Sequence, residues 1–202
     1  MVKIQGFDEY PYLQLFEGDV ESITSVVRDT IPAWMRPVVW EIGCWGGATT
    51  LLLMELLKPT SLNCVDTFDG RGSILQDAAK GRDIMALLRE NLSHFDCPAN
   101  IYLADSKVFC QFVADESADV IFVDGDHRYE GVLADIRGWY PKLKPSGVIM
   151  GHDFDGKTYD EDLVNKDNDN GYHHGVVKAV LGQFPGVQNN GRVWYHVKND
   201  QG

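Results

Sequence analysis

Acidic side chains stand at or near the ends of several short apolar runs of the sequence. Two of these acids have histidines close by: Asp124 is three residues before His127, and His152 directly precedes Asp153. Carboxylates accept hydrogen bonds from hydroxyl groups and bind divalent cations, and an imidazole can take up a proton near neutral pH. Gathered at one place, such residues would suit ligand binding combined with proton transfer. The candidates are Glu41, Asp66, Asp105, Asp124, His127, His152 and Asp153.

A glycine-rich turn, Gly43-Cys44-Trp45-Gly46-Gly47, follows the first apolar run. It differs from the dinucleotide-binding pattern GxGxxG because Trp45 stands at the second glycine, where the backbone would have to approach a pyrophosphate. The turn also lacks the GK[ST] of a phosphate loop, and the sequence Gly156-Lys157-Thr158 lies outside this turn. Asp66 ends the next apolar run, where a carboxylate can accept hydrogen bonds from both hydroxyls of a ribose. A ligand with a ribose but no phosphate fits these residues, and S-adenosylmethionine is the common molecule of that kind.

Short β-rich runs alternate with helical stretches from residue 38 onward. Continuous apolar runs suit strands covered on both faces, and helices between them indicate right-handed crossovers. We therefore expect a doubly wound, mostly parallel, seven-stranded α/β sheet with an antiparallel C-terminal strand. Ser106 is expected to cap one helix, and residues 144–147 are expected to form a turn. The expected strands include residues 38–42, 61–65, 101–104, 120–123, 148–150 and 192–197, and the expected helices include 48–57, 77–92, 106–113, 131–139 and 174–184.

Two segments interrupt this alternation. Residues 1–36 have apolar side chains at helical spacing between Val20 and Val27, which predicts an amphipathic helix that packs on the sheet or caps a pocket. Residues 154–174 form a long acidic loop that leaves directly from the end of an expected strand. Its place suits an active-site lid, although a solvated insertion would have the same composition. We treat residues 1–202 as one domain that carries both segments as additions.

The amino-acid composition limits the kinds of partner that this protein is expected to bind. The chain has 202 residues, 44% of them hydrophobic, which is enough for one substantial core. Its 18 basic and 30 acidic residues give a formal net charge of −12, which disfavours nucleic acid and anionic membranes as partners. No run approaches the roughly 20 apolar residues of a membrane span. Four cysteines without CxxC spacing, and no secretory leader, lead us to expect a cytoplasmic protein with reduced thiols.

The most specific motifs are Asp124-Gly125-Asp126-His127-Arg128-Tyr129-Glu130-Gly131-Val132, which continues to Asp135 in the pattern DGDHxYEGVxxD, and Gly151-His152-Asp153-Phe154. With the glycine turn and Asp66, they resemble the class I S-adenosylmethionine-dependent methyltransferases. More narrowly, the chain is similar to the small-molecule O-methyltransferase family that includes macrolide-sugar methyltransferases and the cephalosporin-tailoring enzyme. The resemblance extends over about residues 36–198. It implies a Rossmann-like fold, S-adenosylmethionine as cofactor, and methyl transfer to a hydroxyl of a small molecule.

The resemblance implies a role along the cofactor for residues near the strand ends. Gly43 and the adjoining turn would lie against the methionine portion, with Thr49 near its carboxylate. Asp66 would hold the ribose, and Ser106 with Asp105 would lie along the adenine. The residues implied in cofactor binding are Glu41, Gly43, Thr49, Asp66, Thr67, Asp105, Ser106 and Asp124.

The resemblance also implies a divalent cation, held by the acid after the fourth strand and by two residues after the fifth. Those positions are Asp124, His152 and Asp153. The macrolide-sugar enzymes have Glu-Asp at the last pair and the catechol-type enzymes have Asp-Asn, so His152 departs from both. Two carboxylates suit magnesium, and an added imidazole favours manganese, iron or zinc. The alternative is that His152 points away and only the two carboxylates bind.

His127 stands where related enzymes place the base that receives the acceptor's proton. A sulfonium methyl is already activated, so the enzyme has to align an oxygen with it and lower the cost of removing that oxygen's proton. We therefore expect His127 to be the general base, the alternative being a histidine that orients Asp124.

Two other classes of function stay open. A metal-dependent hydrolase would use the same acids and histidines but would leave the adenosine-binding features unexplained. A catalytically silent S-adenosylmethionine-binding module would keep the fold without turnover. No pattern in the sequence identifies the methyl acceptor, decides whether the chain forms a homo-oligomer, or shows whether residues 154–174 close over a ligand.

Overall fold

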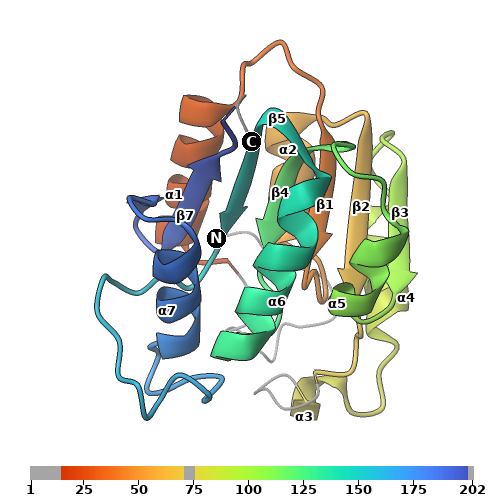
Figure 1. Cartoon of the computed structure of the whole chain (residues 1–202). Coiled ribbons are helices and arrows are strands. Elements are labelled where there is room, and N and C mark those ends of the chain that lie inside the picture. Colours follow the sequence, from red (N-terminus) through yellow and green to blue (C-terminus); the bar gives the residue numbers. More distant parts are fainter. Residues whose placement is uncertain (1–14, 71–75, 200–202) are drawn as a thin grey trace.

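The computed structural model of the chain describes residues 15–70 and 76–199. Its strands are β1 (Val38–Ile42), β2 (Ser61–Asp66), β3 (Ala99–Leu103), β4 (Ala118–Val123), β5 (Leu143–Gly151), β6 (Gln188–Asn190) and β7 (Val193–Val197). Within the described residues they form one sheet in the order β3-β2-β1-β4-β5-β7-β6 (Figure 1). Neighbours from β3 to β5 are parallel, and β7 is antiparallel to β5 and β6. The predicted fold class is confirmed.

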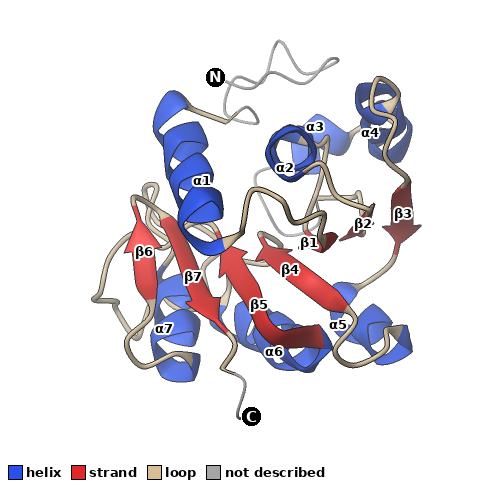
Figure 2. Ribbon diagram, turned by 90° about the horizontal axis from the view of Figure 1, so that it is seen from above, coloured by secondary structure: helices blue, strands red, loops and turns tan. Residues whose placement is uncertain are grey.

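Helices cover both faces of this sheet (Figure 2). They are α1 (Glu17–Thr30), α2 (Ala48–Leu57), α3 (Gln76–Ala79), α4 (Ile84–Leu92), α5 (Ser106–Phe109), α6 (Tyr129–Trp139) and α7 (His174–Gln183), with short 3₁₀ turns at Cys110–Phe112 and Tyr140–Lys142. On one face, Ile23 of α1, Leu53 of α2 and Leu88 of α4 belong to a single apolar cluster. On the other, Ile136 of α6 and Val177 of α7 belong to a second cluster. Coverage on both faces explains why the strands β1 and β4 are apolar over almost their whole length.

The parallel register brings the carboxyl ends of the strands to one edge of the sheet. Ile42 of β1 pairs with Val65 of β2 and with Val123 of β4, and Val123 pairs with Gly151 of β5. The residues that follow these pairs are Gly43, Asp66, Asp124 and His152. Ligands of open α/β sheets bind beyond this edge.

Two local predictions are wrong in detail. The helix expected over residues 77–92 is divided in two, because Gly81 takes a left-handed φ of +74°. A separate helix, α4, begins after its N-cap residue Asp83, whose carboxylate accepts the Ala86 N–H. The turn expected over residues 144–147 lies within the bounds of β5, where the register with β4 shifts.

The two added segments differ in how firmly they pack. The predicted N-terminal helix is α1, and its apolar face is buried at Ile23 and Val26, while residues 1–14 of that segment lie outside the described residues. Between β5 and α7 the chain is mostly irregular, with an isolated bridge between Asp169 and Tyr172. In this stretch Val164 is buried and its carbonyl accepts the N–H of Tyr129, so the segment is attached to the start of α6. None of the helices described has the length and apolar character that crossing a membrane requires.

Candidate active site

The glycine turn after β1 brings the ends of three strands together. Gly43 has a φ of +82° and packs so closely on β4 that a Cβ at this position would overlap the carbonyl of Asp124. Only glycine meets both conditions without strain. Trp45 is also left-handed, with a φ of +46°, and its N–H donates to Asp66 Oδ2 at 2.8 Å. The turn is therefore tied to β4 by close contact and to β2 by a hydrogen bond.

A cleft of about 390 Å³ opens beside this turn. That volume is within the range of small-ligand sites. Of the predicted cofactor-binding residues, the cleft is lined by Gly43, Asp66, Thr67, Asp105, Ser106 and Asp124. Glu41 and Thr49 are both buried and do not line it.

Glu41 lies behind the turn, fully enclosed by the core. Burial raises the pKa of the Glu41 carboxyl to about 8. Cys64 Sγ lies 4.0 Å from Oε2 of Glu41, and Oε1 has no hydrogen-bond partner among the residues described. A carboxyl in this setting is mostly protonated at neutral pH.

Both carboxylate oxygens of Asp66 accept hydrogen bonds from backbone N–H groups. Oδ1 accepts the Phe68 N–H at 2.7 Å, and Oδ2 accepts the Trp45 N–H. Burial raises the pKa of Asp66. Each carboxylate oxygen has a further lone pair, so Asp66 can support the turn and still accept hydrogen bonds from a ligand in the cleft.

At the end of the cleft near α5, the structure corrects the predicted helix cap and shows a further lining residue, Asp135. Asp105, rather than Ser106, caps α5, because its Oδ1 accepts the Lys107 N–H at 2.9 Å. Ser106 instead donates from Oγ to Asp135 Oδ1 at 2.5 Å. Asp135 also lines the cleft, and burial raises its pKa to about 7. It lies on α6 with its side chain almost fully enclosed, and it is the last residue of the motif DGDHxYEGVxxD that begins at Asp124, although it was not among the predicted site residues.

The three predicted metal ligands come together. Asp124, His152 and Asp153 each offer a ligand atom within 4.8 Å of the others. His152 Nδ1 lies 3.1 Å from Asp153 Oδ1, so His152 points toward the carboxylates rather than away from them. Asp153 is buried and left-handed, with a φ of +61°, a conformation that is uncommon outside glycine and that often occurs at functional sites. Oxygen and imidazole donors in this number fit a divalent cation.

His127 faces the same carboxylates. Its Nε2 lies 3.1 Å from Asp153 Oδ2 and 3.6 Å from Asp124 Oδ1, but at angles that make no hydrogen bond among the described residues. Its Nδ1 lies 3.2 Å from Oδ1 of Asp167 in the loop before α7. Burial alone would lower the pKa of His127, but Asp153, Asp124 and Asp167 together raise it well above its ordinary value.

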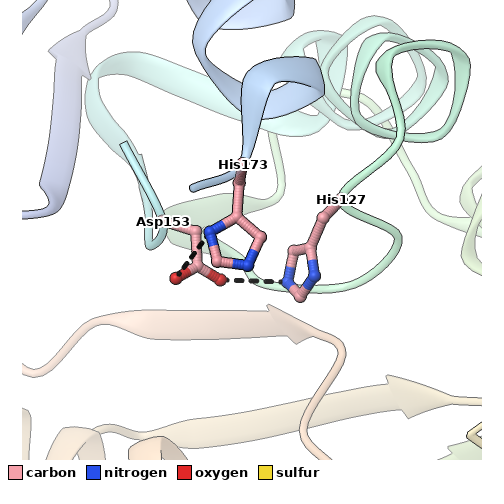
Figure 3. A group of neighbouring side chains, drawn as sticks. All are labelled: His127, Asp153 and His173. Carbon is pink, nitrogen blue, oxygen red and sulfur yellow. Dashed lines mark ion pairs between the residues drawn. The ribbon is translucent and has the colours of Figure 1, made fainter. Parts of the chain in front are cut away.

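His173 lies beside His127, with the ring centroids 4.8 Å apart, and each imidazole faces a different oxygen of Asp153 (Figure 3). These three residues also offer ligand atoms within 4.8 Å of one another. Both nitrogens of His173 have partners, however: Nδ1 lies 2.9 Å from Asp155 Oδ2, and Asn168 Nδ2 donates to Nε2 at 2.9 Å. The His173 side of Asp153 is therefore better described as part of an ionic network than as a cation site.

Arg192 completes that network. Its Nε donates to Asp155 Oδ1 at 2.6 Å and its Nη2 to Asp153 Oδ1 at 2.5 Å. The imidazoles of His127 and His152 outweigh the effect of burial and hold the pKa of Asp153 well below its ordinary value. Arg192 and Asp155 belong to no motif and were not among the predicted site residues.

A family model described as a methyltransferase domain matches residues 40–154, which is more than half of the chain and includes the glycine turn, Asp66, Asp124 and Asp153. The chain belongs to this methyltransferase family. The predicted class I fold and S-adenosylmethionine as cofactor are thereby confirmed. In this methyltransferase the cleft beside Gly43 opens at the carboxyl edge of the sheet, where open α/β sheets bind their ligands.

Several solved structures share the fold of the methyltransferase. Cofactor-bound Rv0187 from MTB has a TM-score of 0.64 at 15% identity, over 94% of this chain and 84% of that one. An O-methyltransferase from Bacillus cereus in complex with SAH has a TM-score of 0.57 at 16% identity, over 92% and 83%. MycE from the mycinamycin biosynthetic pathway, in complex with Mg, SAH and mycinamycin VI, has a TM-score of 0.55 at 15% identity, over 89% and 50%. At these identities the likeness shows the fold alone.

One curated relative shares a short stretch of sequence. The uncharacterized protein y4gI of Sinorhizobium fredii is 46% identical over 41 residues, which are 20% of the methyltransferase but 4% of that protein. The methyltransferase thus corresponds to a small part of that relative's length.

Proposed function

We propose that the methyltransferase transfers a methyl group from S-adenosylmethionine to a hydroxyl of a small molecule, assisted by a divalent cation at Asp124, His152 and Asp153. One observation carries the proposal: Asp124 lines the cofactor cleft and also belongs to the cation group. An acceptor oxygen directed to the cation would therefore lie beside the cleft that holds the methyl donor. The MycE structure, which shares this fold, is in complex with both Mg and SAH.

The cofactor contacts follow from the lining of the cleft. We assign the ribose to Asp66, the adenine to Ser106 with Asp105, and the remaining contacts to Gly43, Thr67 and Asp124. Glu41 and Thr49 would act from behind the turn by keeping its shape.

The protein has to orient the acceptor and remove its proton. When bound, a divalent cation offsets the negative charge of the carboxylates and lowers the pKa of a hydroxyl beside it. His127 is the proposed general base, since its Nε2 is buried, lacks a hydrogen bond and faces the two carboxylates. The neighbouring carboxylates favour the charged imidazole, so the base form of His127 would require a cation that offsets the charge of Asp124 and Asp153. In that form Nδ1 donates a hydrogen bond to Asp167, and Nε2 is free to receive the proton.

The walls around the acceptor would come from the two added segments. Asp19 of α1 and Asp167 of the loop after β5 both reach histidines of the site. The loop would close over the acceptor as a lid by moving its exposed part, residues 157–162, while Val164 stays buried. A hydrolase is not favoured, because it gives the methyltransferase motifs and the cleft no role.

Release of S-adenosylhomocysteine measures the proposed reaction. Hydroxyl acceptors such as catechol and mycinamycin VI, each with Mg²⁺ or Mn²⁺, are expected to include a substrate whose methylation stops on chelation. Undiminished methylation after prolonged chelation would remove the cation from the proposal. Binding of S-adenosylmethionine with no turnover on a broad panel of hydroxyl compounds would favour a silent binding module.

His127→Ala tests the proposed base. We expect S-adenosylmethionine affinity to change little, turnover to fall by roughly 10² to 10⁴, and the acidic limb of the pH profile to disappear. Wild-type turnover with an unchanged acidic limb would make His127 structural.

A further inference from the structure

Asp19 occupies an unusual place for an acidic residue. It is in the first turn of α1, four residues before Ile23, so both side chains lie on the face of the helix that packs on the sheet. Its side chain is only 13% exposed. A carboxylate on an apolar face is costly unless it is paired. Glu17, in the same turn, is exposed.

The partner of Asp19 is a histidine of the proposed cation group. Asp19 Oδ1 lies 3.0 Å from Nε2 of His152, and Oδ2 accepts the Phe16 N–H at 3.3 Å. The other ring nitrogen of His152 lies 3.1 Å from Asp153 Oδ1. One imidazole therefore joins a carboxylate of α1 to a carboxylate at the end of β5.

The imidazole of His152 thus lies between two carboxylates, an arrangement that also occurs at metal sites. A histidine that binds a metal usually donates its other N–H to a carboxylate, which fixes the tautomer and the orientation of the ring. With the proton on Nε2 and donated to Asp19, Nδ1 of His152 presents its lone pair to the side where Asp153 and Asp124 offer their oxygens.

The position of Asp19 is set by packing rather than by the site itself. Ile23 and Val26 of α1 are almost fully buried, and Ser25 Oγ accepts a hydrogen bond from Asn190 Nδ2 at 3.0 Å. α1 thus rests on the β6 and β7 end of the sheet and delivers Asp19 to His152 as a preformed support.

We propose that Asp19 is a positioning residue that holds His152 as a nitrogen ligand, so that the methyltransferase binds a divalent transition-metal ion such as Mn²⁺ in preference to Mg²⁺. The inference rests on the cation site of the proposed function. It adds that α1 supports this site and that the preferred ion is a transition metal. Carboxylate oxygens serve both ions, whereas an imidazole ligand contributes mainly to the transition metal. The competing explanation is that His152 only neutralises Asp153, as Arg192 does.

The test compares Mn²⁺ and Mg²⁺ binding by calorimetry and records the electron spin-echo spectrum of the Mn²⁺-loaded full chain, with no acceptor needed. The wild type is expected to prefer Mn²⁺ and to show ¹⁴N modulation from imidazole, which His152→Gln reduces. Asp19→Asn keeps the shape of the side chain and should weaken Mn²⁺ binding about 10- to 100-fold, with little effect on Mg²⁺. Glu17→Gln, which removes an acid from the same helical turn, should leave both affinities unchanged.

Three results would overturn the inference: no ¹⁴N modulation from His152 in the wild type, equal loss of Mn²⁺ and Mg²⁺ binding in Asp19→Asn, or unchanged Mn²⁺ affinity in that variant. The wild-type spectrum does not depend on the folding of any variant. S-adenosylmethionine binding, measured on the same samples, separates this failure from that of the proposed function. If the protein binds S-adenosylmethionine but His152 does not ligate Mn²⁺, only the inference is overturned. If S-adenosylmethionine does not bind and His152 does not ligate Mn²⁺, the proposed function is overturned as well.

Discussion

Asp66 combines two tasks at a single carboxylate. It accepts the N–H groups of Trp45 and Phe68 and lines the cleft where the ribose would lie. We expect Asp66→Ala to weaken S-adenosylmethionine binding by one or two charge-assisted hydrogen bonds, on the order of 1.5 to 3 kcal/mol each. Asp66→Asn retains one acceptor oxygen and should lose less. Calorimetry on folded protein measures both, and an unchanged affinity in Asp66→Ala would remove Asp66 from the cofactor site.

Glu41 makes stability depend on pH. Its folded pKa of about 8 lies above the ordinary value of 4.5, so the folded state holds a proton that the unfolded chain releases. The free energy of unfolding should therefore decline as pH rises from about 4.5 to about 8, by up to about 1.4 kcal/mol per pH unit, and should level off above that. Glu41→Gln removes this contribution. In urea denaturation, the wild type should lose stability relative to Glu41→Gln between pH 5 and pH 8, and parallel curves would contradict the assignment.

At the scale of elements, the glycine turn depends on close backbone contact with β4. Gly43→Ala introduces both a strained φ and an overlap with the carbonyl of Asp124. Gly186→Ala is the matched control, because Gly186 has a similar φ of +85° and open space around its Cα. We expect the control to lose about 1 kcal/mol of stability and Gly43→Ala to lose about 1 to 3 kcal/mol more, together with cofactor affinity.

Equal destabilisation of the two glycine variants would show that the turn has room for a side chain. A Gly43→Ala variant that keeps wild-type cofactor affinity would show that the turn does not contact the ligand. Thermal denaturation and calorimetry on the same preparations distinguish these outcomes.

The strands of the sheet and the helices between them could be predicted because the sequence patterns that mark them are local. Apolar runs such as 120–123 mark strands covered on both faces, and the helices between them require parallel crossovers. The break at Gly81 and the cap at Asp105 were missed, because glycine is tolerated within helical patterns and because Asp105 and Ser106 are both good N-cap residues.

At the scale of the whole molecule, the site is only partly visible in the sequence. Asp124, His152 and Asp153 follow strands whose ends meet, so their approach follows from sheet topology. Asp19 of α1 reaches His152, and Arg192 of the turn before β7 reaches Asp153, and both contacts depend on how these elements pack on the sheet. No spacing along the chain records that packing.

The central claim is that the cofactor cleft and a divalent cation site meet at Asp124. A crystal structure grown with S-adenosylhomocysteine and Mn²⁺, with anomalous data collected at the manganese edge, tests it most directly. The account predicts the nucleoside in the cleft beside Asp66 and an anomalous peak bounded by Asp124, His152 and Asp153. Nucleoside density away from that cleft, or a fully occupied nucleoside with no manganese peak at those residues, would contradict it.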